Sequence, residues 1–448
     1  MISSRLLDIV GPLAERFRAN GHELYLVGGI VRDELLARGT GTWADIDLTT
    51  DARPDETKRL VAPFATAVWT QGERFGTIGC YIGSHPFEIT TFRGEAYDPD
   101  SRKPTVVFAD ALDSDLSRRD FTINAIAADA STGVLHDPFD GRGDLAARVL
   151  RTPLGADVSF SDDPLRMLRA ARFLARFALD AAPDIEDAIA RQRDRLAIVS
   201  AERVRDELHK LLAVADPTRG LAFLVGHGLL ERWLPDLAPL AEVHDPSHGG
   251  VDVLTHTLGV VAACSGDVVL RLAALLHDIG KRDGLADHAV RGATCAADQL
   301  LALRHANDEI RHVRTLIALH HRIHDHDAVW GPSEVRAVLA EAGPMIDPLV
   351  ALSDANAGAR SRALASAARG RVDAFRRARR ELGETAADLV PELDGHEIMA
   401  ILGIGPGREV GEARAFLQSI RLDHGAVGPV RAAEALRTWW NERADGLA

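Results

Sequence analysis

The sequence predicts an α+β fold class, with a mixed head followed by an all-helical remainder. Residues 23 to 93 alternate short apolar runs with Gly and Asp, and three of these runs, 23–27, 45–49 and 87–92, have the length and pattern of strands. A helix is expected before them, over residues 6–18. From about residue 145 onward, segments rich in Ala, Leu and Arg carry apolar residues three and four apart, which is the helical period. We therefore expect a small mixed sheet with helices, and then helices alone.

Composition favours a folded cytoplasmic protein over an exported or membrane protein. Hydrophobic residues make up 46% of the 448 and charged residues 26%, which are the proportions of an ordinary globular protein. Arg5 and Asp8 interrupt the stretch that a secretory signal would keep apolar. The longest apolar run, 268–276, is far shorter than the roughly 20 residues of a membrane span. The three cysteines lie too far apart for a disulfide framework or a zinc knuckle. We expect a cytoplasmic protein with no membrane partner.

Net charge restricts how the protein could bind a polyanion. The formal charge is −14, which argues against a surface covered with Lys and Arg. Residues 360–380 are the exception, with eight arginines and one acid, Asp373. This stretch fits either a contact with a nucleic-acid backbone or a solvated helix face that pairs with acids elsewhere, and the sequence favours neither. The candidate RNA contacts are Arg360, Arg362, Arg376 and Arg377.

A glycine pair and an acidic pair form the first chemical motif. Gly28 and Gly29 follow the first predicted strand, where the missing Cβ lets backbone N–H groups approach a phosphate. Arg32, four residues after Gly28, could add a fork of hydrogen-bond donors. Asp45 and Asp47 begin the second strand, whose period of two turns both carboxylates to one face. Such a pair holds the hard divalent cations of two-metal phosphoryl transfer.

Glu88, in the third predicted strand, is the candidate third catalytic carboxylate. Each motif alone has a plain structural explanation, since glycines are common in turns and acid pairs are common at solvated strand ends. The inference rests on their combination.

Two Arg-rich motifs follow. Arg118 and Arg119 suit a triphosphate, while Asp120 and Asn124 can hydrogen-bond to a sugar or a base. After Asp163, arginines recur every three or four residues, which places them on one side of a helix. A salt-bridged helix surface is the alternative explanation. The arginines of this stripe are Arg166, Arg169, Arg172 and Arg176.

In order and spacing, these motifs resemble those of bacterial tRNA nucleotidyltransferases and poly(A) polymerases of class II. The resemblance covers the first half of the chain. It implies a polymerase-β-like nucleotidyltransferase head that uses Mg²⁺, a helical neck, and C-terminal helices that hold tRNA. It further implies that CTP and ATP are selected by side chains without a nucleic-acid template. The stretches that carry it are 28–33, 45–47, 118–125 and 163–173.

The family's nucleotide-reading motif, Glu-Asp-x-x-Arg, is matched by residues 162–166. Asp163 and Arg166 are therefore the base readers that the resemblance implies, since Asp accepts from the amino group shared by cytosine and adenine and Arg donates to a ring nitrogen or to cytosine O2. Asp162 stands where the family usually has Glu. Asp163 could also cap a helix that begins at Pro164.

A second set of chemical residues lies in the helical half. Neutral imidazoles and carboxylates bind divalent transition metals, and an adjacent His-Asp can serve one or two ions. Residues 275–281, Leu-Leu-His-Asp-Ile-Gly-Lys, resemble the core of the HD domain superfamily. The resemblance implies Ni²⁺, Mn²⁺ or Mg²⁺ and a phosphatase or 2′,3′-cyclic phosphodiesterase activity, with a degenerate scaffold as the alternative. The candidate ligands are His256, His277, Asp278, His288, His320 and Asp354.

These observations predict four regions: a nucleotidyltransferase head over 1–148, a nucleotide- and RNA-binding neck over 149–242, an HD metal-binding domain over 243–345 and an RNA-binding helical region over 346–448. The expected activity is addition of CCA to the 3′ end of tRNA from CTP and ATP, with release of pyrophosphate. A poly(A) polymerase or an A-only adding enzyme would share the same motifs. An alternative from another class is a metal-dependent phosphohydrolase whose head only binds RNA.

Overall fold

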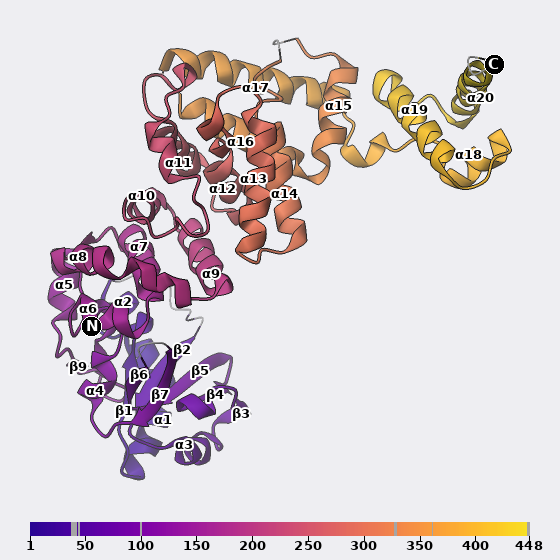
Figure 1. The fold of residues 1–448 in the computed structure, drawn as a ribbon. Coiled ribbons are helices and arrows are strands. Elements are labelled where there is room, and N and C mark those ends of the chain that lie inside the picture. The colour runs from indigo at the N-terminus through magenta and orange to yellow at the C-terminus, as the bar shows by residue number, and fades with distance from the viewer. Residues whose placement is uncertain (37–42, 44, 99–100, 327–328, 361, 446–448) are drawn as a thin grey trace. The chain divides into compact units, whose positions relative to one another are not determined.

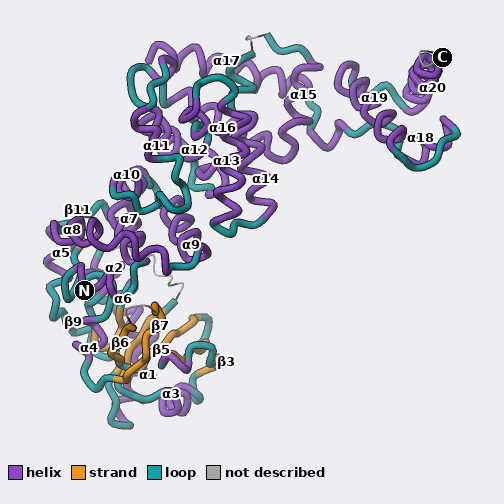
Figure 2. Tube along the Cα trace, in the orientation of Figure 1, coloured by secondary structure: helices purple, strands orange, loops and turns teal. Residues whose placement is uncertain are grey.

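The chain divides into two compact units, Met1–Arg232 and Trp233–Ala448 (Figure 1). The computed structural model describes residues 1–36, 43, 45–98, 101–326, 329–360 and 362–445. Strands gather in the first unit, whereas the described part of the second is helical apart from one isolated bridge (Figure 2). The predicted α+β class is confirmed, but the neck that was expected to be all-helical contains a small two-stranded sheet, β10 (Val149–Leu150) with β11 (Asp180–Ala181).

A seven-stranded sheet forms the centre of the head. Its order is β3-β4-β5-β2-β1-β8-β9, with β2 and β5 parallel and the other neighbours antiparallel. The three strands predicted from the sequence are confirmed as β1, β2 and β5, which are neighbours at the middle of the sheet. The strands are β1 (Leu24–Val27), β2 (Ile46–Thr50), β3 (Ala65–Trp69), β4 (Thr77–Ile82), β5 (His85–Thr91), β8 (Ala127–Asp129) and β9 (Leu135–His136).

The two faces of this sheet have different surroundings. On one face, Leu26, Leu48 and Ile89 are buried in a core that they share with helices α1 (Ser4–Ala19) and α3 (Pro54–Val61). On the opposite face a smaller core is completed by α4 (Leu112–Ser117). Because side chains alternate along a strand, the residues between the core positions, including Asp47 and Glu88, project from this second face.

Several short elements complete the head. The helix α2 (Gly29–Leu35) leads away from β1, and β6 (Arg93–Asp98) pairs with β7 (Ser101–Phe108) in a separate two-stranded sheet. A 3-10 turn, η2 (Thr122–Asn124), packs against both α2 and α5 (Gly141–Ala147). These contacts bring the Arg118–Asn124 segment next to the glycine turn.

Five helices form the neck of the first unit. The central one is α7, which is amphipathic and packs against α9 and α10. Two short parallel strands, β10 (Val149–Leu150) and β11 (Asp180–Ala181), flank it. The helices are α6 (Ala156–Asp162), α7 (Leu165–Phe177), α8 (Pro183–Gln192), α9 (Ala201–Leu212) and α10 (Thr218–Gly226).

Helices α11 to α17 make the larger part of the second unit, and the last three helices have a core of their own around Ile398, Leu417 and Leu436. The helices are α11 (Val253–Ala263), α12 (Val268–Leu276), α13 (His288–Ala302), α14 (Asn307–Leu319), α15 (Pro332–Ala342), α16 (Ile346–Gly358), α17 (Arg362–Leu382), α18 (Gly395–Leu402), α19 (Arg408–His424) and α20 (Pro429–Asp445).

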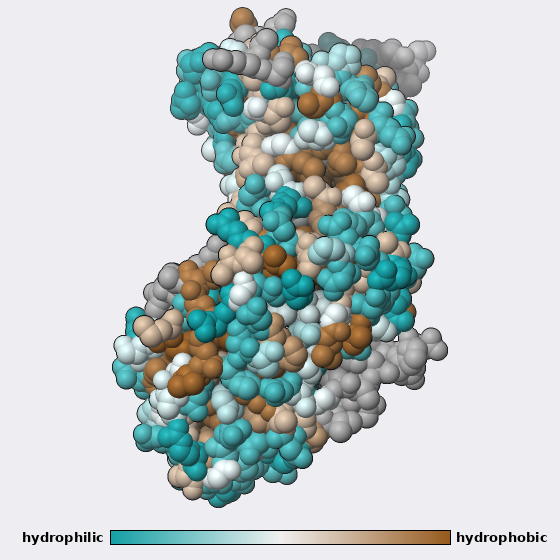
Figure 3. Space-filling view, turned by 90° about the vertical axis from the view of Figure 1, so that its left-hand side faces the viewer, coloured by the Kyte–Doolittle hydropathy of each residue, from teal (hydrophilic) through white to brown (hydrophobic). Residues whose placement is uncertain are grey.

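On the visible side of the molecule, hydrophobic residues form several clusters among hydrophilic ones (Figure 3). Among the described residues, every helix is too short or too polar to cross a bilayer.

Candidate nucleotidyl-transfer site and histidine-rich centre

Three carboxylates lie together at the start of β2 and the middle of β5. Asp47 is the register partner of Glu88, so the two side chains project from the same face of neighbouring strands. Asp45 precedes Asp47 by two residues and is exposed. Both aspartates line one cavity. Burial raises the pKa of Asp47 to about 6, since the attraction of Arg119 is offset by the negative charges of Glu88 and Asp45. The positive charge near Asp47 is therefore too small to balance the three carboxylates.

The turn after β1 brings a cation to these acids. Gly28 has a φ of 76°, a left-handed conformation that favours glycine. A Cβ at Gly28 would lie 3.2 Å from Arg119 Nη1 and 3.8 Å from Asp47 Oδ2. The glycine thus permits the guanidinium and the carboxylate to approach the backbone from the same side.

Arg118 and Arg119 are held by a buried acid, Asp115, which is fully inaccessible to solvent. Arg118 Nη2 donates to Asp115 Oδ1 at 2.7 Å, and Arg119 Nη2 donates to Asp115 Oδ2 at 3.2 Å. Burial opposes ionisation of Asp115, but the two arginines outweigh it and keep its pKa below the usual value. Thr49 of β2 also donates to this carboxylate, at 3.3 Å. Asp115 therefore fixes both guanidinium groups relative to β2.

The side chain of Arg32 is buried within the head. Its side chain is 5% accessible, its Nε donates to Asp33 Oδ1 at 2.9 Å, and its guanidinium lies 4.3 Å from the ring centroid of Phe177. Its Nη1 donates to the side-chain oxygen of Asn124. Burial lowers the pKa of Arg32, although Asp33 opposes the shift. Arg32 thus provides a fixed positive charge below the glycine turn, and it also orients Asn124.

Asp120 connects the head motif to the neck. Its Oδ1 accepts from Asn124 Nδ2 and its Oδ2 accepts from Arg169 Nε, both at 2.9 Å. Although burial favours the neutral acid, Arg169, the Asn124 hydrogen bond and Arg166 lower the pKa of Asp120 to about 2. Asp120 is therefore a permanently charged link between η2 and α7.

The proposed base readers lie at the N-terminal end of α7. Asp163 Oδ2 accepts from Arg203 Nη2 of α9 at 2.7 Å, and Asp163 Oδ1 accepts from the Leu165 backbone N–H at 3.1 Å. Arg166 Nη1 donates to Ser159 Oγ at 2.9 Å. Asp163 thus meets a helix terminus and a cation at once, so the capping interaction and the ion pair coexist.

Arg172 faces the interior of the neck, where its Nε donates to Glu207 Oε2 at 2.8 Å. Arg169 Nη1 also reaches Glu207, at 3.5 Å. Glu207 is 3% exposed, and although burial opposes ionisation, these arginines and Lys210 keep its pKa below the usual value. The arginine stripe predicted from the sequence is confirmed as one helix, α7, but its charges are ordered by acids from α9 and the head.

Two cavities open along these residues. One of about 240 Å³ is bounded by the arginine pair, by Asp120 and by the Asp163–Arg203 pair. The other, of about 930 Å³, runs from Asp45 and Asp47 to Arg172, Arg176 and the end of α9. The larger cavity is thus lined by two of the carboxylates, and the smaller one by the two Arg-rich motifs.

Sequence reasoning missed three residues that organise this site: Asp115, Arg203 and Glu207. A signal for Asp115 exists, because it precedes Arg118 and Arg119 by three and four residues, the spacing of ion pairs on a helix. Arg203 and Glu207 belong to a Glu-Arg-x-x-x-Glu segment that a surface helix explains equally well, so only the packing of α9 on α7 reveals their partners.

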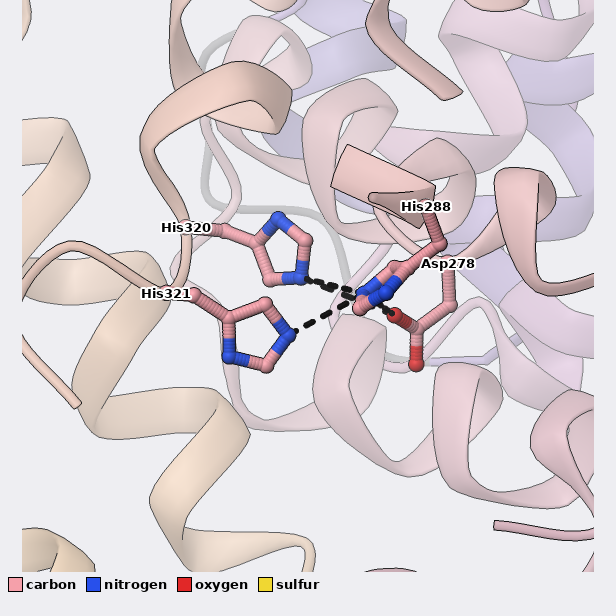
Figure 4. Close-up of side chains that lie close together, drawn as sticks. All are labelled: Asp278, His288, His320 and His321. Atoms are coloured by element: carbon pink, nitrogen blue, oxygen red, sulfur yellow. Dashed lines mark hydrogen bonds and ion pairs between the residues drawn. The ribbon is translucent and has the colours of Figure 1, made fainter. Parts of the chain in front are cut away.

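A second site lies within Trp233–Ala448, around the buried carboxylate of Asp278. Its Oδ1 faces His288 Nε2 at 3.3 Å and His320 Nε2 at 3.6 Å. Its Oδ2 faces His277 Nε2 at 3.2 Å, and also Lys281 Nζ at 2.8 Å. Figure 4 shows His288, His320 and His321 converging on the carboxylate from their helix ends. Asp278 therefore lies between two groups of imidazoles.

The tautomers of three of these histidines are set by the backbone. His277, His288 and His320 each place Nδ1 within 2.6 to 2.7 Å of the carbonyl three residues earlier. Since a carbonyl only accepts, Nδ1 carries the proton and Nε2 offers its lone pair to the cluster. Several lone pairs that point at one carboxylate repel one another unless a cation lies between them.

Burial favours the neutral form of three imidazoles in this centre, those of His256, His320 and His321. It lowers the pKa of His256 to about 3 and that of His320 to about 4, and it lowers the pKa of His321 further. Both ring nitrogens of His256 are buried and accept no hydrogen bond within the described part of the chain. Neutral imidazoles beside a carboxylate are suitable ligands for a divalent transition metal. The residues present therefore fit a metal ion.

Two possible ligand sets share Asp278. One joins it to His288, His320 and His321, and the other joins it to His248 and His256. The sequence assigns a role to neither His248 nor His321, since a single histidine is more often structural than a ligand. Asp354, which was proposed as a ligand, instead pairs with Arg376 Nη2 of α17 at 2.9 Å.

The basic stretch 360–380 forms most of α17, and its arginines differ in their surroundings. Arg376 pairs with Asp354 and Asp373, whereas Arg377 is exposed. Arg360 is half-buried, and burial lowers its pKa. The side chain of Arg362 lies outside the described residues.

Comparisons with known proteins match the same segments. A family model described as "Poly A polymerase head domain" matches residues 24–151, and one described as "Probable RNA and SrmB- binding site of polymerase A" matches residues 179–240. The head and neck are thus similar in sequence to poly(A) polymerases and CCA-adding enzymes. Both the glycine turn and the arginine pair lie inside the first match, and Arg203 and Glu207 lie inside the second.

Similar proteins include the CCA-adding enzyme of Geobacillus stearothermophilus, 38% identical over 227 residues, or 50% of this chain and 54% of that enzyme. The CCA-adding enzyme of Bacillus subtilis is 41% identical over 212 residues, 47% of this chain and 51% of that enzyme. The chain thus matches about half the length of these curated relatives. A crystal structure of the Bacillus stearothermophilus CCA-adding enzyme in complex with CTP has a TM-score of 0.72 at 24% identity, covering 99% of this chain and 100% of that one. This likeness shows a shared fold.

Proposed function

We propose that this chain adds C, C and A to the 3′ end of tRNA from CTP and ATP and releases pyrophosphate. The observation that carries the proposal is the row of acids, Asp45, Asp47 and Glu88, next to an arginine pair and a glycine turn. Relatives named CCA-adding enzymes support it, as does a solved structure of this fold in complex with CTP.

In this proposal, Asp45 and Asp47 hold Mg²⁺, and Glu88 completes the acidic face. When bound, Mg²⁺ would lower the pKa of the attacking hydroxyl and stabilise charge on the departing pyrophosphate. Arg118 and Arg119, fixed by Asp115, receive the triphosphate at the Gly28 turn. Their prior ordering by a buried acid means that little side-chain entropy is lost when the nucleotide binds.

Base selection is assigned to Asp163 and Arg166, which line the smaller cavity. Arg203 holds the Asp163 carboxylate, and Ser159 together with the Arg118 carbonyl holds the Arg166 guanidinium. We regard Arg203 and Ser159 as positioning residues. Arg32, Asp120, Asn124, Arg169 and Arg172 complete the nucleotide site by orienting one another.

The proposal extends to location and organisation. The protein would act in the cytoplasm, with tRNA bound along the arginines of α17. The same proposal divides the chain more finely. It has a head over 1–148, a neck over 149–242, a metal-binding domain over 243–345 and a helical region over 346–448.

The test supplies purified protein with Mg²⁺, labelled CTP and ATP, and three RNAs: a tRNA lacking CCA, a tRNA ending in CC, and an unrelated RNA. The expected result is two C and one A on the first, one A on the second and none on the third. Addition of A alone would instead identify an A-adding enzyme. Long A tails on all three would identify a poly(A) polymerase.

A second candidate activity is favoured by the histidine-rich centre. The convergence of Nε2 lone pairs on Asp278 supports a bound Ni²⁺, Mn²⁺ or Mg²⁺, which would supply a hydroxide at neutral pH. We propose hydrolysis of a phosphate ester such as a 2′,3′-cyclic phosphate. The measurement is phosphate-ester cleavage with each metal after removal of bound ions by chelation. Absence of cleavage with all three would leave the centre without this activity.

A further inference from the structure

An aromatic side chain lies in the same row as the catalytic acids. Trp69 of β3 is the register partner of Gly79 in β4, Gly79 is the partner of Glu88 in β5, and Glu88 is the partner of Asp47 in β2. Register partners point to the same face of a sheet. The indole and both carboxylates therefore project from one face, along a line across four neighbouring strands.

Gly79 lets the indole lie over the sheet toward the acids. A Cβ at Gly79 would be 2.0 Å from both Cε2 and Nε1 of Trp69, a distance that no side chain could occupy. The ring thus covers the Gly79 backbone, one strand away from Glu88, and neighbouring strands are about 5 Å apart. Tyr81 supports the indole from the same face, with ring centroids 5.3 Å apart.

A cavity of about 370 Å³ lies beside this ring, with walls that include Trp69, Phe75, Glu88 and Arg93. Its volume is within the range of small-ligand sites. An aromatic face stacks on any nucleobase, and a guanidinium contacts phosphodiester oxygens. The wall chemistry therefore suits a nucleotide at the end of a strand.

Reaction geometry assigns this cavity to one of the two substrates. The triphosphate cradle at Gly28 and Arg119 lies on the β1 side of β2. The Trp69 cavity lies on the opposite side, beyond β5. Phosphoryl transfer places the attacking and leaving oxygens roughly in line on opposite sides of phosphorus. The attacking hydroxyl must therefore approach from the side on which Trp69 lies.

We propose that this cavity binds the 3′-terminal nucleotide of the acceptor RNA, with its base stacked on Trp69 and its 3′ hydroxyl beside Glu88. The inference rests on the proposed nucleotidyl transfer, because it assigns the attacking substrate of that same site. It identifies Trp69 as a determinant of acceptor binding that acts on every base, since stacking tolerates all four.

The kinetic test compares Trp69→Ala with Trp69→Phe. Loss of the ring should raise KM for tRNA on the order of 10-fold, in line with the strength of base stacking, while KM for CTP and ATP stays unchanged. Trp69→Phe should retain most of the affinity. Gly79→Ala should reproduce the alanine variant, because its Cβ displaces the indole. A rise in KM for CTP instead would overturn the assignment.

Val68→Ala is the matched control, since Val68 is the adjacent residue of β3, is 43% exposed and projects from the opposite face. It should leave KM for tRNA unchanged. An equal loss in Val68→Ala and Trp69→Ala would attribute the effect to β3 and contradict the stacking role.

A binding test separates this inference from the proposed function. The probe is a tRNA that lacks CCA and carries 2-aminopurine at its 3′ end. Stacking of this base on Trp69 should quench its fluorescence in the wild type and not in Trp69→Ala. Normal quenching without nucleotide addition would refute the proposed function and retain the subsite. Normal addition with equal quenching in both proteins would refute the subsite alone.

Discussion

The head contains a partly buried aspartate, Asp47, and the histidine-rich centre contains a buried one, Asp278, and the two aspartates have opposite electrostatics. Burial raises the pKa of Asp47 to about 6, because Glu88 and Asp45 add negative charge and Arg119 compensates only in part. Asp278 is also buried, but His277 and its other partners lower its pKa well below the usual value. Lys281 adds an ion pair at 2.8 Å.

This difference separates the roles of a metal at the two sites. In the head, excess negative charge on oxygen ligands favours a hard cation such as Mg²⁺. Around Asp278, Lys281 supplies an ammonium partner and neutral imidazoles provide the ligands, which favours a transition metal. The following predictions are ordered from the largest expected effect to the smallest.

The largest effect should come from the acidic pair. Asp45→Ala and Asp47→Ala should each reduce nucleotide addition at least about 10³-fold, since each removes a proposed metal ligand. Hydrolysis at the Asp278 centre should be unaffected. The measurement is single-turnover addition to a tRNA ending in CC, with circular dichroism to show that the head is folded. Substantial transfer by both variants would refute the assignment.

The reciprocal variant is His277→Ala, which should abolish phosphate-ester cleavage and leave nucleotide addition within about two-fold, because its contacts to Asp278 lie within the second unit. His312→Ala is a suitable control, since His312 lies on α14 and, unlike His277, is not among the contacts to Asp278 described above. Loss of both activities in His277→Ala would show that the two centres are not independent.

Asp115→Ala should show an intermediate effect on both function and stability. Removing a buried partner of two arginines costs about 3 kcal/mol of unfolding free energy, and the freed guanidinium groups should bind triphosphate on the order of 10-fold more weakly. Thermal unfolding and KM for ATP measure the two effects. Asp113→Ala, an exposed acid on the same helix, should change neither. Unchanged KM for ATP in Asp115→Ala would contradict its positioning role.

The smallest effect concerns pH. The pKa of Asp47 rises from 3.8 to about 6 on folding, so ionising it disfavours the folded state, and this cost appears as pH rises from about 4 to about 6. In chelator, Asp47→Asn should therefore be more stable than the wild type above pH 6, by about 1–3 kcal/mol, with no difference near pH 3.8. Calorimetry across this pH range is the measurement. Greater stability of the wild type above pH 6 without metal would contradict the raised pKa.

The central strands and the acidic row could be predicted from the sequence because both depend on local periodicity. β1 and β2 are mostly buried and β5 alternates between buried and more exposed residues, whereas the middle residues of β3 are exposed. The expected convergence of His277, Asp278, His288 and His320 also agrees with their placement, since three of them lie at helix ends that pack together.

Long-range partners could not be predicted in this way. Asp354 resembles a ligand by composition, yet it pairs with Arg376 because α17 packs on α16. Glu207 and Arg203 gain their roles from the packing of α9 on α7. The Trp69 row depends on the register of four strands, which no short motif encodes.

The most direct test of the central claim measures Mn²⁺ binding by electron paramagnetic resonance in the presence of a non-hydrolysable CTP analogue. A His277→Ala background removes one proposed ligand of the Asp278 centre. Bound Mn²⁺ that depends on the CTP analogue and disappears in both Asp45→Ala and Asp47→Ala is the predicted result. Nucleotide-dependent Mn²⁺ binding that persists in both variants would contradict the account.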